Sequence, residues 1–258
     1  MGKFQGLVRK DFLLLRGAFF TWMIILFILF MMGVALANYN DSMPLLLGVI
    51  AFIYFTHVVL LPGFLYILLR EEEKSQYWLH STSSSITLLL SKLLVSLIYF
   101  LVSLFIIDVI ALVHMKFFSI QYLDIPGNVI PYREGFFLNG TLIFAGIYFS
   151  CWCLFLWTVY HSLTQFPWMK KMRWFIILSG YILFQYVVEK INQLDVVQNL
   201  LHYWVIDVKM DYNIGFTRGT NYLEGRLEIP MIDLFISIGF IVLLFYLASK
   251  LLDRKVEV

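Results

Sequence analysis

Charge is scarce in this sequence. Of its 258 residues only 14% are Asp, Glu, Lys or Arg, whereas 61% are hydrophobic and 18% are aromatic. Soluble domains carry about 25% charged residues, so this composition excludes an ordinary soluble domain and indicates an integral membrane protein. The net charge of +2 gives no reason to expect a nucleic-acid partner.

Motifs of a self-contained enzyme or ATPase are also missing. The chain has no G-x-x-x-x-G-K-[ST] phosphate loop, no H-E-x-x-H zinc motif and no G-x-S-x-G nucleophile elbow. Its histidines stand in different segments without metal-ligand spacing: His57, His80, His114, His161 and His202. We therefore expect no catalytic residue, no metal site and no cofactor bound by this chain.

The cysteines give little information about the structure or the function. The two cysteines, Cys151 and Cys153, lie in one apolar run. Two residues apart on a helix, their side chains face different ways, so we expect no disulfide between them. They say little about the redox compartment.

Long apolar runs, in contrast, fill about half of the chain. A bilayer core needs about 20 apolar residues per helical span. We expect an all-α integral membrane protein with a single transmembrane domain over residues 1–258, and spans at about 17–37, 45–69, 86–113, 136–160, 174–188 and 231–252. The fifth span covers only about 22 Å at 1.5 Å per residue, so it either extends into the next loop or enters the membrane only partly.

Lysine and arginine are distributed unequally between the two sides of these spans. With the N-terminus inside, only six of the 19 fall on the outside: Lys116, Arg133, Lys190, Lys209, Arg218 and Arg226. The positive-inside rule therefore predicts cytoplasmic N- and C-termini in the cell membrane.

Two segments outside the spans, and one residue pair inside the second span, carry structural signals. In residues 3–16 an apolar stripe (Phe4, Leu7, Val8, Phe12, Leu15) predicts an interfacial amphipathic helix, or else a basic flank of the first span. Pro62-Gly63 should kink the second span. In the outer loop 189–230, the stripe in LDVVQNLLHYWV predicts a short helix, either re-entrant or packed on its own loop.

The segment 70–92, between the second and third spans, is too charged and too compatible with a helix for a simple turn. Glu71, Glu72 and Glu73 suit the N-terminus of a short helix. Tyr77 and Trp78 could fill a groove on a cytoplasmic partner. The alternative is a solvated loop with Trp78 at the lipid headgroups.

Polar residues also recur at helical spacing inside the spans. The fifth span has Trp174, Leu178, Tyr181, Gln185 and Glu189 on one face, and the third has Lys92, Ser96, Tyr99 and Ser103. His57 is the best mid-membrane ionisable candidate, whereas Asp108 falls near the outer interface. Such faces line either a translocation path or a subunit interface, or they pack within one subunit. The residues in question are Tyr54, His57, Ser96, Tyr99, Ser103, Tyr181 and Gln185.

At this point the chain resembles a permease subunit of the ABC-2 type ABC exporters. VRKDFLLLR is similar to that family's basic, hydrophobic entry into the first span, and EEEKSQYWLHSTSSSITLLLSKLL to its first cytoplasmic loop. The long loop before the last span resembles the family's extracellular re-entrant region. Two departures concern the helix limits: Ser83 stands where proline is common, and Lys74 or Ser75 where glycine is usual.

The resemblance implies a coupling helix at about 75–82 that docks on a separate ATP-binding subunit, present in two copies, where ATP and Mg²⁺ bind. It assigns the coupling surface to Glu71, Glu72, Glu73, Lys74, Tyr77, Trp78, Leu79 and His80. It also implies a second permease, identical or different, so that this chain forms half of the translocation path. The substrate would be amphipathic or hydrophobic, such as a peptide toxin or antimicrobial peptide, in the manner of Gram-positive exporters of bacteriocins or phenol-soluble modulins.

Two other functions stay open at this stage. One is an ion-coupled secondary transporter with His57 and Asp108 as relays. The other is a non-transporting membrane protein with an immunity or sensor role.

Overall fold

A computed structural model describes residues 2–40, 43–75, 84–114, 132–165, 171–212 and 223–255. Six of its helices are long and apolar enough to cross a membrane, which makes the chain a multi-pass membrane protein. They are α1 (Lys3–Tyr39), α2 (Met43–Ser75), α4 (Ser85–His114), α5 (Tyr132–Ser162), α6 (Arg173–Asn192) and α8 (Met231–Lys255). The shorter elements are η2 (Leu163–Gln165), α7 (Asp195–His202) and the strands β1 (Val205–Tyr212) and β2 (Leu223–Pro230).

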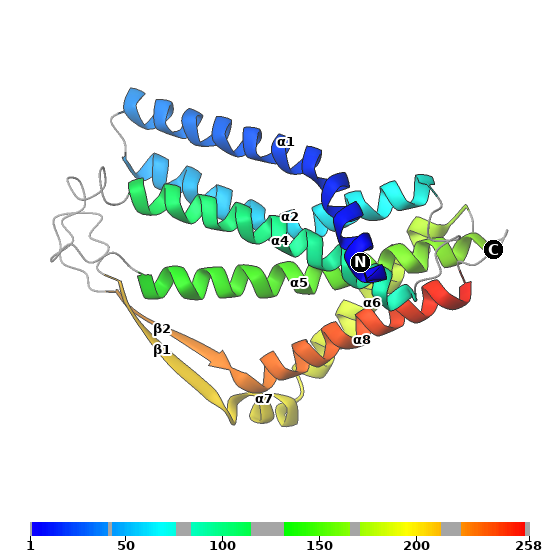
Figure 1. The fold of residues 1–258 in the computed structure, drawn as a ribbon. Coiled ribbons are helices and arrows are strands. Elements are labelled where there is room, and N and C mark those ends of the chain that lie inside the picture. The colour runs from blue at the N-terminus through cyan, green and yellow to red at the C-terminus, as the bar shows by residue number, and fades with distance from the viewer. Residues whose placement is uncertain are drawn as a thin grey trace.

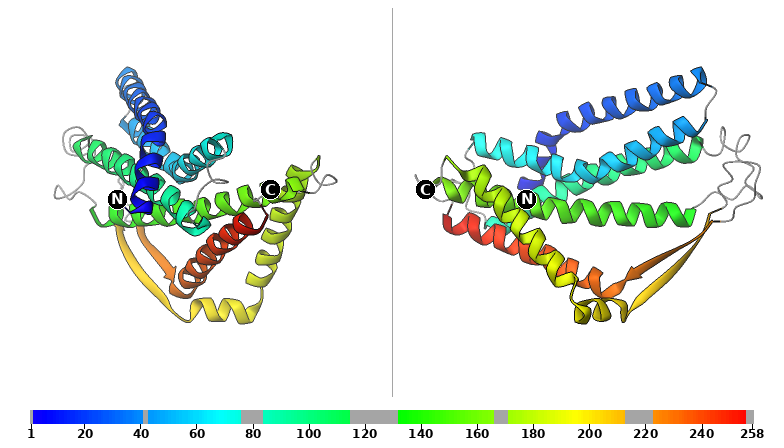
Figure 2. Two further views of the ribbon diagram at one scale, coloured as in Figure 1. Left: turned by 45° about the vertical axis from the view of Figure 1, so that its right-hand side comes forward. Right: turned by 180° about the vertical axis from the view of Figure 1, so that it is seen from behind.

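Successive long helices run in opposite directions (Figure 1). The start of α1, the end of α2, the start of α4 and the end of α8 lie together at one end of the bundle, called here the terminal end. Helices α1, α2, α4 and α5 run side by side, whereas α6 and α8 diverge from them towards α7, and the β1–β2 hairpin leads back to the far end of α5 (Figures 1 and 2). The terminal end therefore brings the start of α1 together with the end of α2 and the start of α4, the two helix ends that flank residues 76–83.

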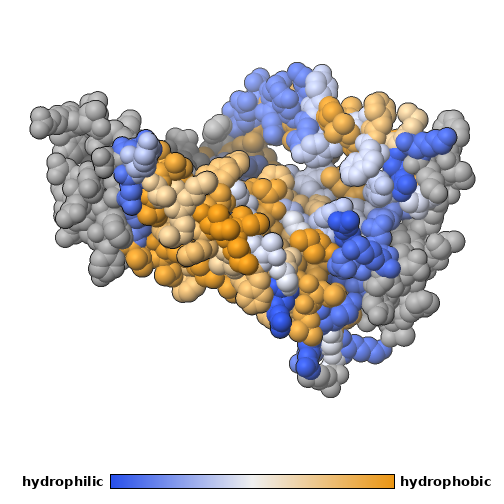
Figure 3. Space-filling model, turned by 90° about the horizontal axis from the view of Figure 1, so that it is seen from above, coloured by the Kyte–Doolittle hydropathy of each residue, from blue (hydrophilic) through white to orange (hydrophobic). Residues whose placement is uncertain are grey.

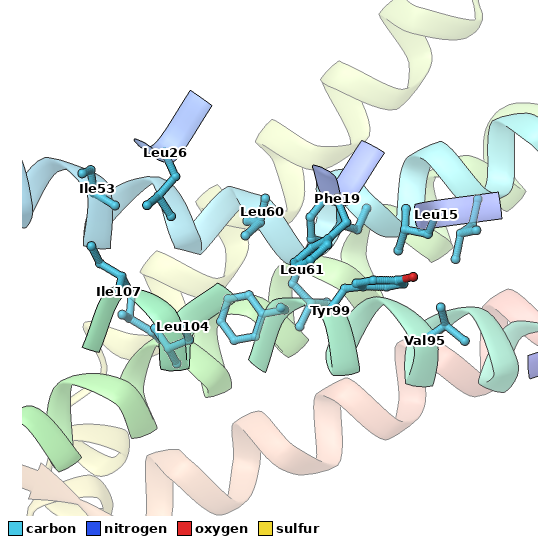
Figure 4. Packing of buried hydrophobic residues seen from close by; sticks show 14 residues of the cluster. Leu15, Phe19, Leu26, Ile53, Leu60, Leu61, Val95, Tyr99, Leu104 and Ile107 are labelled. Atoms are coloured by element: carbon cyan, nitrogen blue, oxygen red, sulfur yellow. The ribbon is translucent and has the colours of Figure 1, made fainter. Parts of the chain in front are cut away.

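The main apolar cluster joins α1, α2 and α4. Leu15 and Phe19 of α1 meet Leu61 of α2 and Tyr99 of α4, and all four are buried (Figure 4). Farther along, a Cβ atom on Gly33 would lie 2.8 Å from Val49 Cγ1. Glycine thus lets α1 and α2 approach closely, as small residues do between membrane helices.

Helix α1 begins at Lys3 and continues without interruption through the first span. The expected interfacial helix is therefore not a separate element, although its first turns lie at an angle to the rest of α1 (Figure 1). Near this bend the Tyr99 hydroxyl donates to the Phe12 carbonyl oxygen at 3.0 Å, and the two rings stack at 4.6 Å between centroids. Side-chain insertion at a backbone carbonyl is a known cause of helix bending.

Helix α2 continues past the second span, through the glutamates, to Ser75. It contains Pro62 and changes direction along its length (Figure 2), as the sequence predicted. The expectation that Glu71, Glu72 and Glu73 begin a new helix was wrong, because they occupy the last turns of α2. The run FLYILLREEEKS contains no glycine or proline, and most of its residues favour a helix, so α2 has no reason to end earlier.

The fifth membrane helix follows one of its two predicted alternatives, whereas part of the loop after it differs from expectation. Helix α6 has 20 residues and spans about 30 Å, so the extension into the loop is the outcome. The short helix predicted from LDVVQNLLHYWV is confirmed as α7. The fold is not purely α-helical, however, because β1 and β2 pair antiparallel, with Ile206 opposite Ile229. The alternation of apolar and charged residues in VIDVKMDY is the strand signal that the helical stripe before it obscured.

Candidate functional site

The most unexpected feature of the interior is a network of four charged side chains at the terminal end. Lys92 of α4 is only 1% exposed, and its Nζ lies 3.1 Å from Asp11 Oδ1 of α1 and 2.6 Å from Glu72 Oε2 of α2. Lys10 Nζ approaches the same Glu72 oxygen at 2.9 Å. Ser91 Oγ donates to Asp11 Oδ2 at 2.8 Å. We call these five residues the ion-pair network.

The ion-pair network joins three helices through their charges. It contains two cations and two carboxylates, so the buried charge is balanced, as an apolar interior requires. Removing one member of a buried pair leaves the other charge uncompensated, which typically costs about 3–5 kcal/mol. The network therefore fixes the end of α2, the start of α4 and the first segment of α1 relative to one another.

Residues expected at the coupling surface lie in different surroundings. Glu71 and Lys74 form an exposed pair at 2.6 Å, and Glu73 Oε2 lies 3.6 Å from His161 Nε2 of α5. Glu72 is turned inward to the ion-pair network and is 3% exposed. The sequence had grouped it with its neighbours, but on a helix three consecutive residues cannot share one face. Tyr77, Trp78, Leu79 and His80 lie outside the described residues.

A second polar network lies in the middle of the bundle around His57, which is fully buried. The His57 Nδ1 lies 2.8 Å from the Ile53 carbonyl oxygen, and Nε2 lies 3.0 Å from Ser103 Oγ. Trp22 Nε1 donates to the same Ser103 oxygen at 2.8 Å. A carbonyl only accepts, so Nδ1 carries the proton and Nε2 accepts from the Ser103 hydroxyl. Every polar atom of this group is thereby satisfied with a neutral imidazole.

A third group surrounds Asp108 on α4. Tyr54 of α2 donates to Asp108 Oδ1 at 2.6 Å, and Asn139 of α5 donates to Oδ2 at 2.8 Å. Six residues separate Asp108 from the end of α4 at His114, a rise of about 9 Å. The carboxylate thus has a donor on each oxygen and ties together α2, α4 and α5.

The polar face predicted for the third span is covered by the chain itself. Lys92, Ser96, Tyr99 and Ser103 are all buried, and Lys92, Tyr99 and Ser103 are each bonded to a residue of α1. Tyr54 and His57 on α2 face the same interior. For these residues the structure shows packing within one subunit.

Helix α6 presents the opposite case, because none of its residues is buried. Tyr181 packs against Trp152 of α5 with the ring centroids 5.3 Å apart. Gln185 is exposed and borders, with Glu189, Asn192 and Gln198 of α7, a shallow polar hollow of about 490 Å³. This part of the predicted path or interface remains accessible to another molecule.

Several residues of these networks were not singled out from the sequence as site residues. Asp11 stands between basic and apolar residues, and Asn139 and Trp22 lie inside apolar spans. Asp11 and Asn139 could have been identified from the sequence, because a charged or amide side chain in an apolar run is buried only beside a polar partner. Among the described residues no three His, Cys, Asp or Glu side chains come together as a metal site would require, and both cysteines are free thiols.

Comparison with known proteins places this chain beside one bacterial relative. It is similar to a protein of Bacillus subtilis (strain 168) named "Uncharacterized protein YhcE", with 26% identity over 264 residues that cover 100% of both chains. No protein-family model matches the chain. No solved structure matches it either. The relative matches the full length of the chain.

Proposed function

We propose that this chain is the membrane-spanning permease subunit of an ATP-driven exporter, with ATP hydrolysis carried out by separate subunits. Six membrane helices without a phosphate loop leave the energy to come from another chain. In this proposal both termini are cytoplasmic, so that the terminal end of the bundle faces the ATP-binding partners.

The observation that carries the proposal is the ion-pair network. It connects the two helix ends that flank residues 76–83 to each other, and it connects both to the bend of α1. Because the ion-pair network joins the end of α2 to the start of α4, movement of a partner docked between them would be transmitted to both helices and to α1. The exposed charges of Glu71, Glu73 and Lys74 border the same segment and would contribute to docking.

Helix α6 supports the second half of the proposal, a permease dimer. A membrane helix without buried residues, carrying Gln185 and Glu189, leaves its polar groups for another protein or a water-filled path, because lipid would not satisfy them. We propose that this face meets the second permease and borders the route of an amphipathic or hydrophobic substrate, such as a peptide toxin.

Alanine substitution of both Tyr77 and Trp78 tests the docking step. The chain is co-expressed with ABC-type ATP-binding subunits of its own organism, and both co-purification and substrate-stimulated ATP hydrolysis in lipid are measured. We expect the double variant to lose at least tenfold in recovered ATPase, because buried aromatics dominate such contacts.

The chain supplies a matched control. Tyr203 and Trp204 form the same dipeptide beyond α7, and both are exposed. Tyr203→Ala/Trp204→Ala should leave ATPase recovery unchanged. Wild-type complex formation and export by the Tyr77→Ala/Trp78→Ala variant would rule out docking through this segment.

One observation favours a second candidate, an ion-coupled carrier. His57 and Asp108 lie within neighbouring groups, and the rings of Tyr54 and His57 have their centroids 6.5 Å apart. Reconstitution of the purified chain alone, with an imposed proton gradient, separates the two functions. Transport driven by the gradient without any ATPase would favour the carrier.

A further inference from the structure

The first segment of α1, residues 3–16, has a more positive surface than its sequence implies. Lys3, Arg9 and Arg16 are exposed, whereas the segment's one carboxylate, Asp11, is 0% exposed and paired with Lys92. The ion-pair network thus removes the only negative charge from the outer side of this segment. What remains at the surface is cationic.

An apolar groove runs along the same segment. It has a volume of about 470 Å³ and lies between α1 and α4. Its α1 positions fall on one helical face, since they recur at steps of four residues and at their neighbours. The apolar lining is Phe4, Val8, Phe12, Leu13 and Leu94, and Arg9 lies at its border.

The groove also has a stable floor. Phe12 stacks on Tyr99, and Leu94 follows Lys92 by two residues on the start of α4. The contacts that hold α1 against α4 here are thus those of the ion-pair network and of the α1 bend. The groove is fixed by buried interactions and does not depend on an exposed loop.

We propose that this groove binds an anionic phospholipid, with an acyl chain along Phe12 and Leu94 and the phosphate on Arg9. An acyl chain matches the apolar lining, and a guanidinium binds a phosphate through two parallel hydrogen bonds. The neighbouring cations attract acidic headgroups from the same leaflet. The apolar surface over α1 gives way to hydrophilic side chains towards the terminal end, as a lipid at the membrane boundary requires (Figure 3).

The positive charge around the groove distinguishes an anionic phospholipid from a zwitterionic one as its ligand. A groove that recognised only the acyl chain would bind both lipids equally. The exposed Lys3, Arg9 and Arg16, with no exposed acid between them, predict a preference for the anionic headgroup. This inference does not rest on the proposed transport function.

Native mass spectrometry of the full-length chain tests the preference. The protein, purified in neutral detergent, is mixed with phosphatidylglycerol or with phosphatidylcholine of the same acyl chains, and the retained lipids are counted. Wild type should retain phosphatidylglycerol at least threefold better. Arg9→Gln should reduce this ratio to near one, whereas Leu94→Trp, which fills the groove, should reduce retention of both lipids.

Two variants serve as controls. Lys250→Gln removes an exposed cation from α8 at the same end of the bundle, and Leu101→Trp enlarges an exposed leucine of α4 outside the groove. Both should behave as wild type. Equal retention of the two lipids by wild type, or equal losses in Arg9→Gln and Lys250→Gln, would overturn the proposal.

Discussion

Helices α4 and α6 both have polar residues on one face, yet the fold treats them oppositely. On α4, Ser96 and Ser103 are 0% exposed, enclosed with Lys92 and Tyr99 by α1 and α2. On α6 no residue is buried, and Gln185 and Glu189 lie open. The same sequence pattern therefore has two structural outcomes.

A polar stripe on a membrane helix therefore indicates that the helix contacts a polar partner, but it does not identify that partner. For α4 the partners come from the same chain: Asp11 and Glu72 for Lys92, and Trp22 and His57 for Ser103. For α6 the chain supplies aromatic contacts: Tyr181 and Phe184 pack against Trp152 of α5, and Phe184 stacks on Phe240 of α8. Exposed polar groups in hydrocarbon are costly, so the open polar face of α6 is where the proposed second subunit would make its contacts.

Lys92→Ala is the strongest test of the α4 side. It removes the buried cation that pairs with both Asp11 and Glu72. We expect a loss of about 3–5 kcal/mol in the free energy of unfolding, because buried carboxylates become uncompensated. Unfolding in mixed detergent–SDS micelles measures the change. Lys74→Ala, which removes the exposed pair with Glu71, should cost no more than about 1 kcal/mol; similar losses for both lysines would contradict the importance of burial.

Two buried serines on α4 allow a finer test. Ser103→Ala removes the acceptor of Trp22 Nε1 and the partner of His57 Nε2, so we expect a loss of about 1–3 kcal/mol. Ser96 Oγ is equally buried but has no hydrogen-bond partner within the described residues. Ser96→Ala should therefore be neutral or stabilising in the same micelle assay. The mid-bundle network would lose its assigned role if the two substitutions had the same effect.

The smallest expected effect concerns the exposed face of α6. Gln185→Leu makes that face more apolar without touching a buried residue. If a second subunit satisfies Gln185, dimerisation should weaken by about 1 kcal/mol, roughly fivefold in the dissociation constant. Förster transfer between labelled copies in liposomes measures this. Ser103→Ala gives the control, since it should change stability and leave association unaltered; unchanged association of Gln185→Leu would indicate that another partner or water covers α6.

Much of the fold could be predicted from the sequence. Apolar length located all six membrane helices, and the helical stripe located α7. The limit of α2 was misjudged because charged residues were taken to end a span, although Glu and Lys continue a helix well. For α6 the sequence left two outcomes open, and the structure shows the longer helix. The hairpin was missed because a two-residue period followed immediately after a helical one.

Less of the site could be predicted. Helical spacing correctly grouped Lys92, Ser96, Tyr99 and Ser103. It could not find Asp11 or Trp22 as their neighbours, or Asn139 as the neighbour of Asp108, because these come from other helices. Spacing along one helix contains no information on which helix lies opposite. The inward turn of Glu72, next to the exposed Glu71 and Glu73, depends on the same missing information.

The sequence by itself determined that this is a membrane protein with six apolar helices and without a nucleotide-binding motif of its own, because apolar length and local motifs are properties of contiguous residues. Only the tertiary structure decided which polar groups are internal and which are left for other molecules. It buried Asp11 and Glu72 around Lys92 and left Gln185 open. The physical reason is that a charge in an apolar interior is tolerated only beside its partner, and partners 20 to 81 residues apart meet only when the helices pack.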